Sequence, residues 1–342
     1  MEKRFLIARW LGSDIPSIPI YDEASVSSAR QRVRAAGLTS NASKDLIETV
    51  ALMASELTQN QLAHARQGYF GVRPIERGSI RGLEILAADL GPGFEKRVLT
   101  GSPPTGDSLG AGLESVFRLA DEVEIDTRGA EGLRVLVRKF ETQTPSSYEV
   151  AIAGVPYPGE AISGDDAICL ETDSGFLAAL CDGLGHGPEA REASKRAVDA
   201  IAKNKDLGLR EIVNVVNEEM KGLRGCVLAL VRFTAQSRVL QCLLAGDIRV
   251  HLYLFRDAHF FTSTPFVIGD RDLPSRRLRV EEMMAAPGSV LVMFTDGLES
   301  RTSIKGNLEL LRKPALLIAQ DLLAEHSRGT DDALVLVARF KK

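Results

Sequence analysis

Residues 176–187 read Phe-Leu-Ala-Ala-Leu-Cys-Asp-Gly-Leu-Gly-His-Gly, an apolar run that ends at an acidic, glycine-rich turn. The apolar half, residues 176–181, is typical of a buried strand. Asp182 follows it directly, and an Asp at the end of a buried strand costs free energy unless it is paired or bound to a cation. Pro188 comes next, at the first-turn position that proline favours in helices. The stretch therefore predicts a buried strand, an acidic turn and a helix over residues 188–202.

The same arrangement, an acidic turn beside an apolar run, occurs three more times in the C-terminal part of the chain. The three turns are Ser163-Gly164-Asp165-Asp166, Thr295-Asp296-Gly297 and Thr330-Asp331-Asp332. Turn chemistry alone explains a single Asp-Gly or Gly-Asp pair, because these dipeptides are common in turns. Four of them converging from strand ends would form an oxygen-rich pocket suited to Mg²⁺ or Mn²⁺. The sequence has no His and Cys cluster with zinc spacing that would compete.

This pattern resembles the PPM (type 2C) metal-dependent protein phosphatases, in particular their bacterial sporulation and stress-response branch, over about residues 148–341. The resemblance implies an α-β-β-α sandwich, two Mn²⁺ or Mg²⁺ ions, and hydrolysis of phosphoserine or phosphothreonine. Asp182 is the implied catalytic residue because it would bridge the two ions. The implied metal ligands are Asp165, Asp182, the carbonyl of Gly183, Asp296 and Asp331.

Three further residues of this region receive a structural interpretation. The eukaryotic branch often has a His two positions after the bridging Asp, where this chain has Leu184. His186 is expected to shape the loop, with protonation of the leaving group as the alternative. Asp247 and Asp270 are interpreted as turn residues, and no phosphate-clamping Arg can be assigned from the sequence.

A second constellation lies in the N-terminal part, on a helix predicted over residues 41–66. Glu56, Asn60 and His64 are four residues apart and therefore share one helix face. A carboxylate there can orient a water or hydroxyl, and an Asn oxygen can complete a Mg²⁺ shell. By themselves these three residues are more typical of a solvated polar face.

Downstream residues favour nucleotide binding. Asp89 ends a strand predicted over residues 82–88 and is followed by Gly91 and Gly93. An Asp at this place can accept a hydrogen bond from an adenine amino group, and the glycines let the backbone approach the base. The glycine-rich residues 100–112 then precede a helix predicted over 113–120, and a helix N-terminus is suited to phosphate.

The ordered set resembles the Bergerat-fold (GHKL) ATP-binding family, especially the anti-sigma-factor serine kinases and the stressosome switch kinase. The matching boxes are Ser55-Glu56-Leu57-Thr58-Gln59-Asn60, Asp89-Leu90-Gly91-Pro92-Gly93-Phe94 and Leu109-Gly110-Ala111-Gly112-Leu113. The resemblance implies a Bergerat-fold α/β sandwich that binds ATP with Mg²⁺. Its implied roles are general base for Glu56, Mg²⁺ ligand for Asn60, and adenine recognition for Asp89. His64 and the glycines Gly91, Gly93, Gly110 and Gly112 complete the implied nucleotide site.

One family feature is missing. A Gly-Thr pair often stands near the last strand of these kinases, whereas residues 129–133 here read Gly-Ala-Glu-Gly-Leu. The absent Thr removes one polar contact near the nucleotide.

Length and charge agree with an α/β protein of two domains. At roughly 150 residues per domain, 342 residues predict about two. We expect an ATPase domain over residues 1–140, a linker over 141–147 and a phosphatase domain over 148–342. The net charge of −4 offers no basic field for nucleic acid. The sequence has no apolar run near the roughly 20 residues that span a bilayer and no visible signal peptide, so a cytoplasmic protein without a membrane partner is expected.

Together the two resemblances predict a partner-switching regulator, a kinase-like domain fused to a Ser/Thr phosphatase. The implied target is a STAS-type antagonist or stressosome protein that carries phosphoserine or phosphothreonine, with a sigma factor or a downstream switch protein as a further partner. The resemblance is also compatible with a homodimer. Two alternatives stay open: the N-terminal domain only senses ATP and regulates the phosphatase, or it only binds a sigma factor or antagonist.

Overall fold

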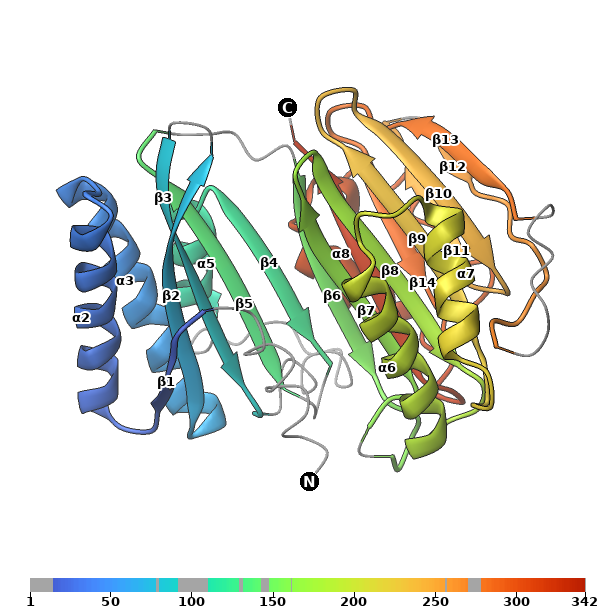
Figure 1. Cartoon of the computed structure of the whole chain (residues 1–342), viewed down its shortest axis with the longest axis horizontal. Helices are drawn as coiled ribbons and strands as arrows, with labels where there is room; N and C mark the ends of the chain where they lie inside the picture. The colour runs from blue at the N-terminus through green and yellow to red at the C-terminus, as the bar shows by residue number, and fades with distance from the viewer. Residues whose placement is uncertain are drawn as a thin grey trace. The chain divides into compact units, whose positions relative to one another are not determined.

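The helices and strands divide between two units, Met1–Glu149 and Val150–Lys342, in the computed structural model (Figure 1). The structure describes residues 15–77, 80–91, 110–128, 132–142, 148–160, 162–255, 257–269 and 278–341. Gly93, Asp270, most of the predicted linker and a strand expected over residues 5–8 lie outside these ranges. None of the described helices is long and apolar enough to cross a membrane.

The N-terminal unit is an antiparallel sheet with helices on one face, which confirms the predicted α/β class. In spatial order its strands are β1 (Ser17–Ile20), β2 (Gly68–Arg77), β3 (Ile80–Asp89), β5 (Leu133–Phe140) and β4 (Glu122–Thr127). The helices are α2 (Glu23–Thr39), α3 (Lys44–Asn60) and α5 (Gly110–Leu119). The sequence predicts no strand at β2, because its Gly, Pro and Arg residues interrupt the alternation of apolar and polar residues that is typical of a strand.

The sequence predicts an amphipathic helix over residues 22–36 that Gly37 ends, but the helix does not end there. Helix α2 continues to Thr39, and Gly37 is buried against the next helix. A Cβ atom at Gly37 would lie 2.4 Å from Cγ1 of Ile47 in α3. The glycine therefore lets two helices approach closely, a role that a helix-ending interpretation misses.

Helix α3 starts later than expected and changes its winding at its C-terminal end. Ser43 caps it by accepting a hydrogen bond from the Leu46 amide at 3.3 Å. After Asn60 the chain forms a π-helical turn, η1 (Gln61–Ala65), and leaves it through Arg66 at a φ of 64°. Such turns are rare and often occur at functional sites.

A line of alternating charges crosses four strands of this sheet. Arg73, Glu84, Arg138 and Glu122 are register partners on β2, β3, β5 and β4, so their side chains share one face. Arg138 Nε lies 2.6 Å from Glu84, and its Nη1 lies 2.8 Å from Glu124 and 3.3 Å from Glu122. Arg138 and the three glutamates are buried, whereas Arg73 is half-buried. One guanidinium thus holds three buried carboxylates together.

The C-terminal unit has two sheets between two helix layers, which is the predicted α-β-β-α sandwich (Figure 1). One sheet holds, in order, β13 (Val280–Met284), β10 (Val239–Ala245), β9 (Cys226–Thr234), β8 (Gly175–Gly183) and β7 (Asp165–Thr172). The other holds β6 (Tyr148–Val155), β15 (Ala333–Phe340), β14 (Val290–Phe294), β11 (Arg249–Tyr253) and β12 (Ala258–Phe260). The helices are α6 (Pro188–Lys203), α7 (Leu209–Glu219) and α8 (Ala315–His326).

Apolar side chains hold these layers together. The rings of Phe176, Phe233 and Phe340 meet between the two sheets, with centroids 4.7 to 6.3 Å apart. A second buried cluster packs α6 and α7 against the sheet that contains β8 and β9. Helix α8 is shorter than the helix that the sequence predicts over about residues 308–325. Pro314 cannot continue a helix, and residues Leu310–Arg312 form a separate 3₁₀ turn.

We expect Arg138→Ala to destabilise the N-terminal unit by about 3–5 kcal/mol, because the change removes the buried cation that three carboxylates share and leaves them only the more exposed Arg73, Arg77 and Arg134. Urea unfolding followed by hydrogen exchange at the β5 amides measures this. The control is Arg34→Ala, which removes an exposed ion pair to Glu48 at 2.9 Å and should destabilise far less, because water and salt screen exposed pairs. Equal losses for the two variants would contradict the proposed importance of the buried network.

Candidate functional site

The acidic turns of the C-terminal unit meet at one edge of its two sheets. Asp165 and Asp182 are register partners at the ends of β7 and β8. Asp296 follows β14, and Asp331 precedes β15, the antiparallel neighbour of β14. The topology therefore places the ends of four strands together, each of which carries one predicted ligand.

The charges of these carboxylates influence one another. Burial, followed by the charges of Asp296 and Asp247, raises the pKa of Asp182 to about 8. Burial and the charge of Asp182 also hold the pKa of Asp165 well above its ordinary value. The pKa of Asp296 is raised by burial and by its acidic neighbours. Each carboxylate is therefore costly to ionise in this place without a compensating cation.

The cluster fits hard divalent cations by its chemistry. Its side-chain donors are all carboxylate oxygens, and Oδ2 of Asp165 is buried without a hydrogen-bond partner. As the side chains stand, no three His, Cys, Asp or Glu groups within the described ranges are arranged closely enough to hold one ion. Repulsion between like charges opposes such an arrangement, and bound cations would remove that repulsion.

The two neighbouring aspartates before β15 have different roles. Asp331 faces the cluster, and its charge contributes to the raised pKa values of Asp165 and Asp182. Asp332 is 2% exposed and fixes a loop, because its two carboxylate oxygens accept from the amides of Tyr157 at 2.7 Å and Gly164 at 2.9 Å. Asp332 thus positions the segment that leads into Asp165. The sequence analysis missed this role.

His186 lies in the turn after Asp182 and is held from two sides. Its ring stacks on Tyr157, with centroids 4.2 Å apart and planes 9° from parallel. Its Nδ1 lies 3.3 Å from Oε1 of Glu160. These contacts join the two loops beside the acidic cluster, which supports the loop-shaping interpretation.

Asp247 is the turn residue that the sequence predicts, and it also lies beside the acidic cluster. It precedes β11, and its charge raises the pKa values of Asp182 and Asp296. Its Ala-Gly-Asp surroundings gave no strong signal, because such a turn between strands is common. Only the pairing of β11 with β14 brings it beside Asp296.

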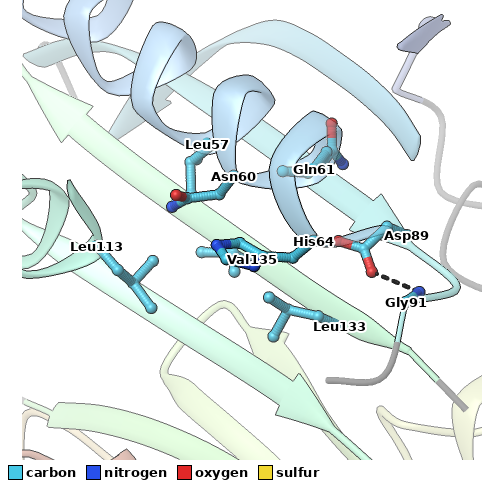
Figure 2. A pocket seen from close by; sticks show the side chains of 10 residues that line it. Leu57, Asn60, Gln61, His64, Asp89, Gly91, Leu113, Leu133 and Val135 are labelled. Carbon is cyan, nitrogen blue, oxygen red and sulfur yellow. Dashed lines mark hydrogen bonds between the residues drawn. The ribbon is translucent and has the colours of Figure 1, made fainter. Parts of the chain in front are cut away.

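The second candidate site is a pocket between α3, η1 and the sheet of the N-terminal unit. Figure 2 shows Asn60 and His64 on the helix, with Asp89 and Val135 on the strands nearby. The residues that line it are Leu57, Asn60, Gln61, His64, Ala87, Asp89, Gly91, Leu113, Leu133 and Val135. The pocket thus has apolar walls with a few polar groups, as small-molecule sites commonly do.

Asp89 is the buried acid of this pocket. Its Oδ1 accepts a hydrogen bond from the Gly91 amide at 2.9 Å (Figure 2). Burial raises the pKa of Asp89 to about 6, although backbone donors partly oppose the shift. The carboxylate is therefore mostly ionised at neutral pH and available as an acceptor.

Gln61, which the sequence analysis did not single out, joins the helix to both strands beside Asp89. Its Nε2 donates to the carbonyls of Tyr69 in β2 at 3.0 Å and Ala88 in β3 at 3.1 Å. A Cβ at Gly68 would lie 2.6 Å from its Cδ, so a side chain at this position would displace the Gln61 amide. Gln61 therefore fixes the end of β3 against the turn that carries His64.

The remaining predicted nucleotide residues are placed as follows. Glu56 is half-buried on α3, one turn before Asn60, and does not line the pocket. Gly110 and Gly112 lie in the first turn of α5, whose Leu113 closes one side of the pocket. Gly93 lies outside the described ranges.

Family models match both parts of the chain. Residues 21–139 match the histidine kinase-like ATPase domain, and residues 172–341 match stage II sporulation protein E. Both matches agree with the resemblances found in the motifs.

Two proteins of Bacillus subtilis (strain 168) are similar in sequence. The serine/threonine-protein kinase RsbT is 34% identical over 88 residues, which are 25% of this chain and 66% of RsbT, just under two thirds. The phosphoserine phosphatase RsbX is 24% identical over 140 residues, 41% of this chain and 69% of RsbX.

Solved structures are similar over 57% of the chain. One of these structures has a TM-score of 0.53 and 26% identity, and the match covers its whole chain. It comes from work on the bacterial stressosome as a modular system adapted to control secondary messenger signalling. RsbX in complex with magnesium has a TM-score of 0.50 and 19% identity, with 96% of its chain covered, and supports the fold.

We expect Asp332→Ala to loosen the loop before Asp165, because two hydrogen bonds to a carboxylate disappear, each worth about 1.5–3 kcal/mol. Hydrogen exchange at the Tyr157 and Gly164 amides should accelerate, and Asp332→Asn, which keeps one acceptor oxygen, should give an intermediate effect. Asp199→Ala on α6 is the control, since Asp199 pairs with Lys195 within its own helix. Unchanged exchange in Asp332→Ala would refute the positioning role.

Proposed function

Because the chain joins a histidine kinase-like ATPase domain to a domain of the stage II sporulation protein E family, we propose that it is a bifunctional regulator of partner switching. One chain carries a nucleotide pocket in its first unit and a cluster of buried carboxylates in its second. This pairing of two sites carries the proposal. The similarity to a serine/threonine kinase and to a phosphoserine phosphatase supports opposite reactions on one kind of substrate.

The C-terminal unit is proposed to hydrolyse phosphoserine or phosphothreonine. Two Mg²⁺ or Mn²⁺ ions, when bound, would activate a water and neutralise charge on the phosphoryl group. Asp165 and Asp182 face each other across β7 and β8 and would share the ions, which suits Asp182 to the bridging position. The proposed ligand set is Asp165, Asp182, the carbonyl of Gly183, Asp296 and Asp331, with Asp247 beside it.

The N-terminal unit is proposed to bind ATP with Mg²⁺ and to phosphorylate a serine or threonine. Asp89 would accept from the adenine amino group, and Asn60 would complete the Mg²⁺ shell. Glu56, one turn before Asn60, would act as the general base on the hydroxyl of the protein substrate. Its position outside the pocket lining is compatible with this role, because the base must meet the protein substrate and not the adenine.

The proposed substrate of both units is a STAS-type antagonist or a stressosome protein. The similarity to RsbT, RsbX and a structure from the bacterial stressosome supports this class of partner. A sigma factor or a downstream switch protein would compete for the same partner in such a system.

The second candidate function is an ATP-sensing domain without kinase activity. The absence of Thr in residues 129–133 favours it, because one polar contact to the nucleotide is lost. A domain that only docks a sigma factor or antagonist would bind no ATP at all. Nucleotide binding and phosphate transfer therefore separate the three functions.

We expect the two activities to be separable on one STAS-domain protein in a time course with labelled ATP. Glu56→Ala should slow phosphorylation by about 10²-fold or more while ATP binding survives, since a general base acts on the chemical step. Asp182→Ala should abolish dephosphorylation, so that phosphoprotein accumulates.

Chelator should reproduce the phosphatase defect, and Asp199→Ala should behave as wild type. If Asp182→Ala binds ATP but accumulates no phosphoprotein, the N-terminal unit is a sensor. If chelator leaves dephosphorylation unchanged, the metal mechanism is wrong.

We expect ATP affinity to fall at acid pH because protonation removes the acceptor on Asp89. The pKa of Asp89 is raised to about 6, so the ionised, ATP-binding form predominates above pH 6 and is lost as the pH falls below it. Calorimetry should show roughly a tenfold loss at pH 5 relative to pH 7.5. Asp89→Asn should bind weakly and keep only the pH dependence of ATP itself, whereas an identical pH profile in both proteins would contradict this assignment.

A further inference from the structure

A cavity of about 150 Å³ lies next to the acidic cluster, at the adjoining ends of β11 and β14. Two of its lining residues, Asp247 and Asp296, belong to the cluster, so the cavity opens onto the proposed metal site. The other lining residues are Arg249, Phe294, Leu298, Ser300 and Arg328. Two arginines and a hydroxyl thus surround a space that adjoins the reaction centre.

Neither arginine is neutralised by a close partner. Both side chains are exposed, and within the described ranges neither guanidinium lies within 4.0 Å of a carboxylate. Arg328 is nevertheless near enough to Asp296 for its charge to oppose the rise in the pKa of that carboxyl. Its charge also acts on Glu299, which is paired with Arg301 at 2.9 Å.

The backbone holds both arginines beside Asp296. The Arg328 amide donates to the carbonyl of Gly297 at 2.9 Å, and Ser327 forms a β-bridge with Leu298. Arg249 is the register partner of Phe294, two residues before Asp296. The main chain of each arginine is therefore fixed relative to a proposed metal ligand, and only the side chain must turn to reach a ligand.

The chemistry of this cavity fits a phosphoryl group. Guanidinium groups bind phosphate oxygens through paired, charge-assisted hydrogen bonds, and they remain charged at all relevant pH values. The carboxylates of Asp247 and Asp296 repel an anion, so phosphate can enter only when cations at the cluster offset their charge. A carboxylate of an acidic substrate segment would meet the same repulsion without the attraction between a phosphoryl group and the metal ions.

We propose that Arg328, together with Arg249, binds the phosphoryl group of the substrate and retains the product phosphate beside Asp296. This inference rests on the proposed phosphatase function. The two arginines would supply the phosphate clamp that the sequence motifs did not locate. Ser300, in the same lining, adds a hydroxyl donor.

The test uses the full chain with Mg²⁺, and compares wild type with Arg328→Ala, Arg249→Ala and the two Lys variants. The substrates are p-nitrophenyl phosphate and a phosphoserine peptide, and inorganic phosphate is the inhibitor. We expect KM for both substrates and the inhibition constant of phosphate to rise about tenfold in Arg328→Ala, with a smaller rise in Arg249→Ala. The Lys variants should recover part of the loss, because they keep the charge but not the paired donors.

Calorimetry of inorganic phosphate with the Mg²⁺-loaded protein provides a readout that does not depend on turnover. Phosphate should bind wild type more tightly than Arg328→Ala, and the difference should vanish with chelator. Arg196→Ala is the control, since Arg196 is also exposed and pairs with Glu219 between α6 and α7, away from the cavity lining.

The outcomes separate the inference from the function on which it rests. A wild-type protein that hydrolyses neither substrate with Mg²⁺ or Mn²⁺ disproves the phosphatase function. An active wild type with unchanged phosphate affinity in Arg328→Ala disproves the clamp alone. A rise in KM for the peptide only would assign the arginines to an acidic flank of the substrate and would also overturn the clamp.

Discussion

Repulsion between buried carboxylates is the constraint on which the C-terminal unit depends. Asp165, Asp182 and Asp296 come from three strand ends, and each has a raised pKa because burial and the neighbouring acids disfavour its charge. A fold keeps such carboxylates together only when the surrounding structure is rigid enough to withstand their mutual repulsion. The two stacked sheets, the phenylalanine cluster between them and the loop fixed by Asp332 provide that rigidity. Cations would convert the repulsion into binding energy, which is why this arrangement points to metal-dependent chemistry.

The buried charges of the N-terminal unit are arranged differently from those of the C-terminal unit. In the N-terminal unit they are paired, with Arg138 balancing three carboxylates across the sheet, and they leave one acid, Asp89, in an apolar pocket. Gln61 connects the helix of Asn60 and His64 to the strand of Asp89 through two carbonyls. The site thus depends on a few directional contacts between one helix and two strands, so its geometry is sensitive to any change in the π-helical turn.

The proposed function follows from having both kinds of site in one chain. A nucleotide pocket can add a phosphoryl group and a metal cluster can remove it, so the phosphorylation level of a shared partner would depend on the balance between the two activities. The arginines beside Asp296 would add product retention to that balance, because phosphate held at the site slows the next hydrolysis. In the proposed arrangement, the level of ATP and the level of phosphate would both influence the same partner.

The sequence by itself determined the α/β class, the two family resemblances and most members of the acidic cluster, because these depend on local patterns: apolar runs, Asp-Gly turns and helical spacing. Residues whose role depends on pairing between distant segments were beyond it. Asp247 looks like an ordinary turn residue until β11 pairs with β14, and the role of Asp332 is visible only where its oxygens meet the amides of Tyr157 and Gly164. Gly37 predicted a helix end because local propensity favours that, whereas its contact with Ile47 decided otherwise. Local chemistry thus fixed which residues were available, and the tertiary structure decided which of them meet, because long-range register is not encoded in any short stretch of sequence.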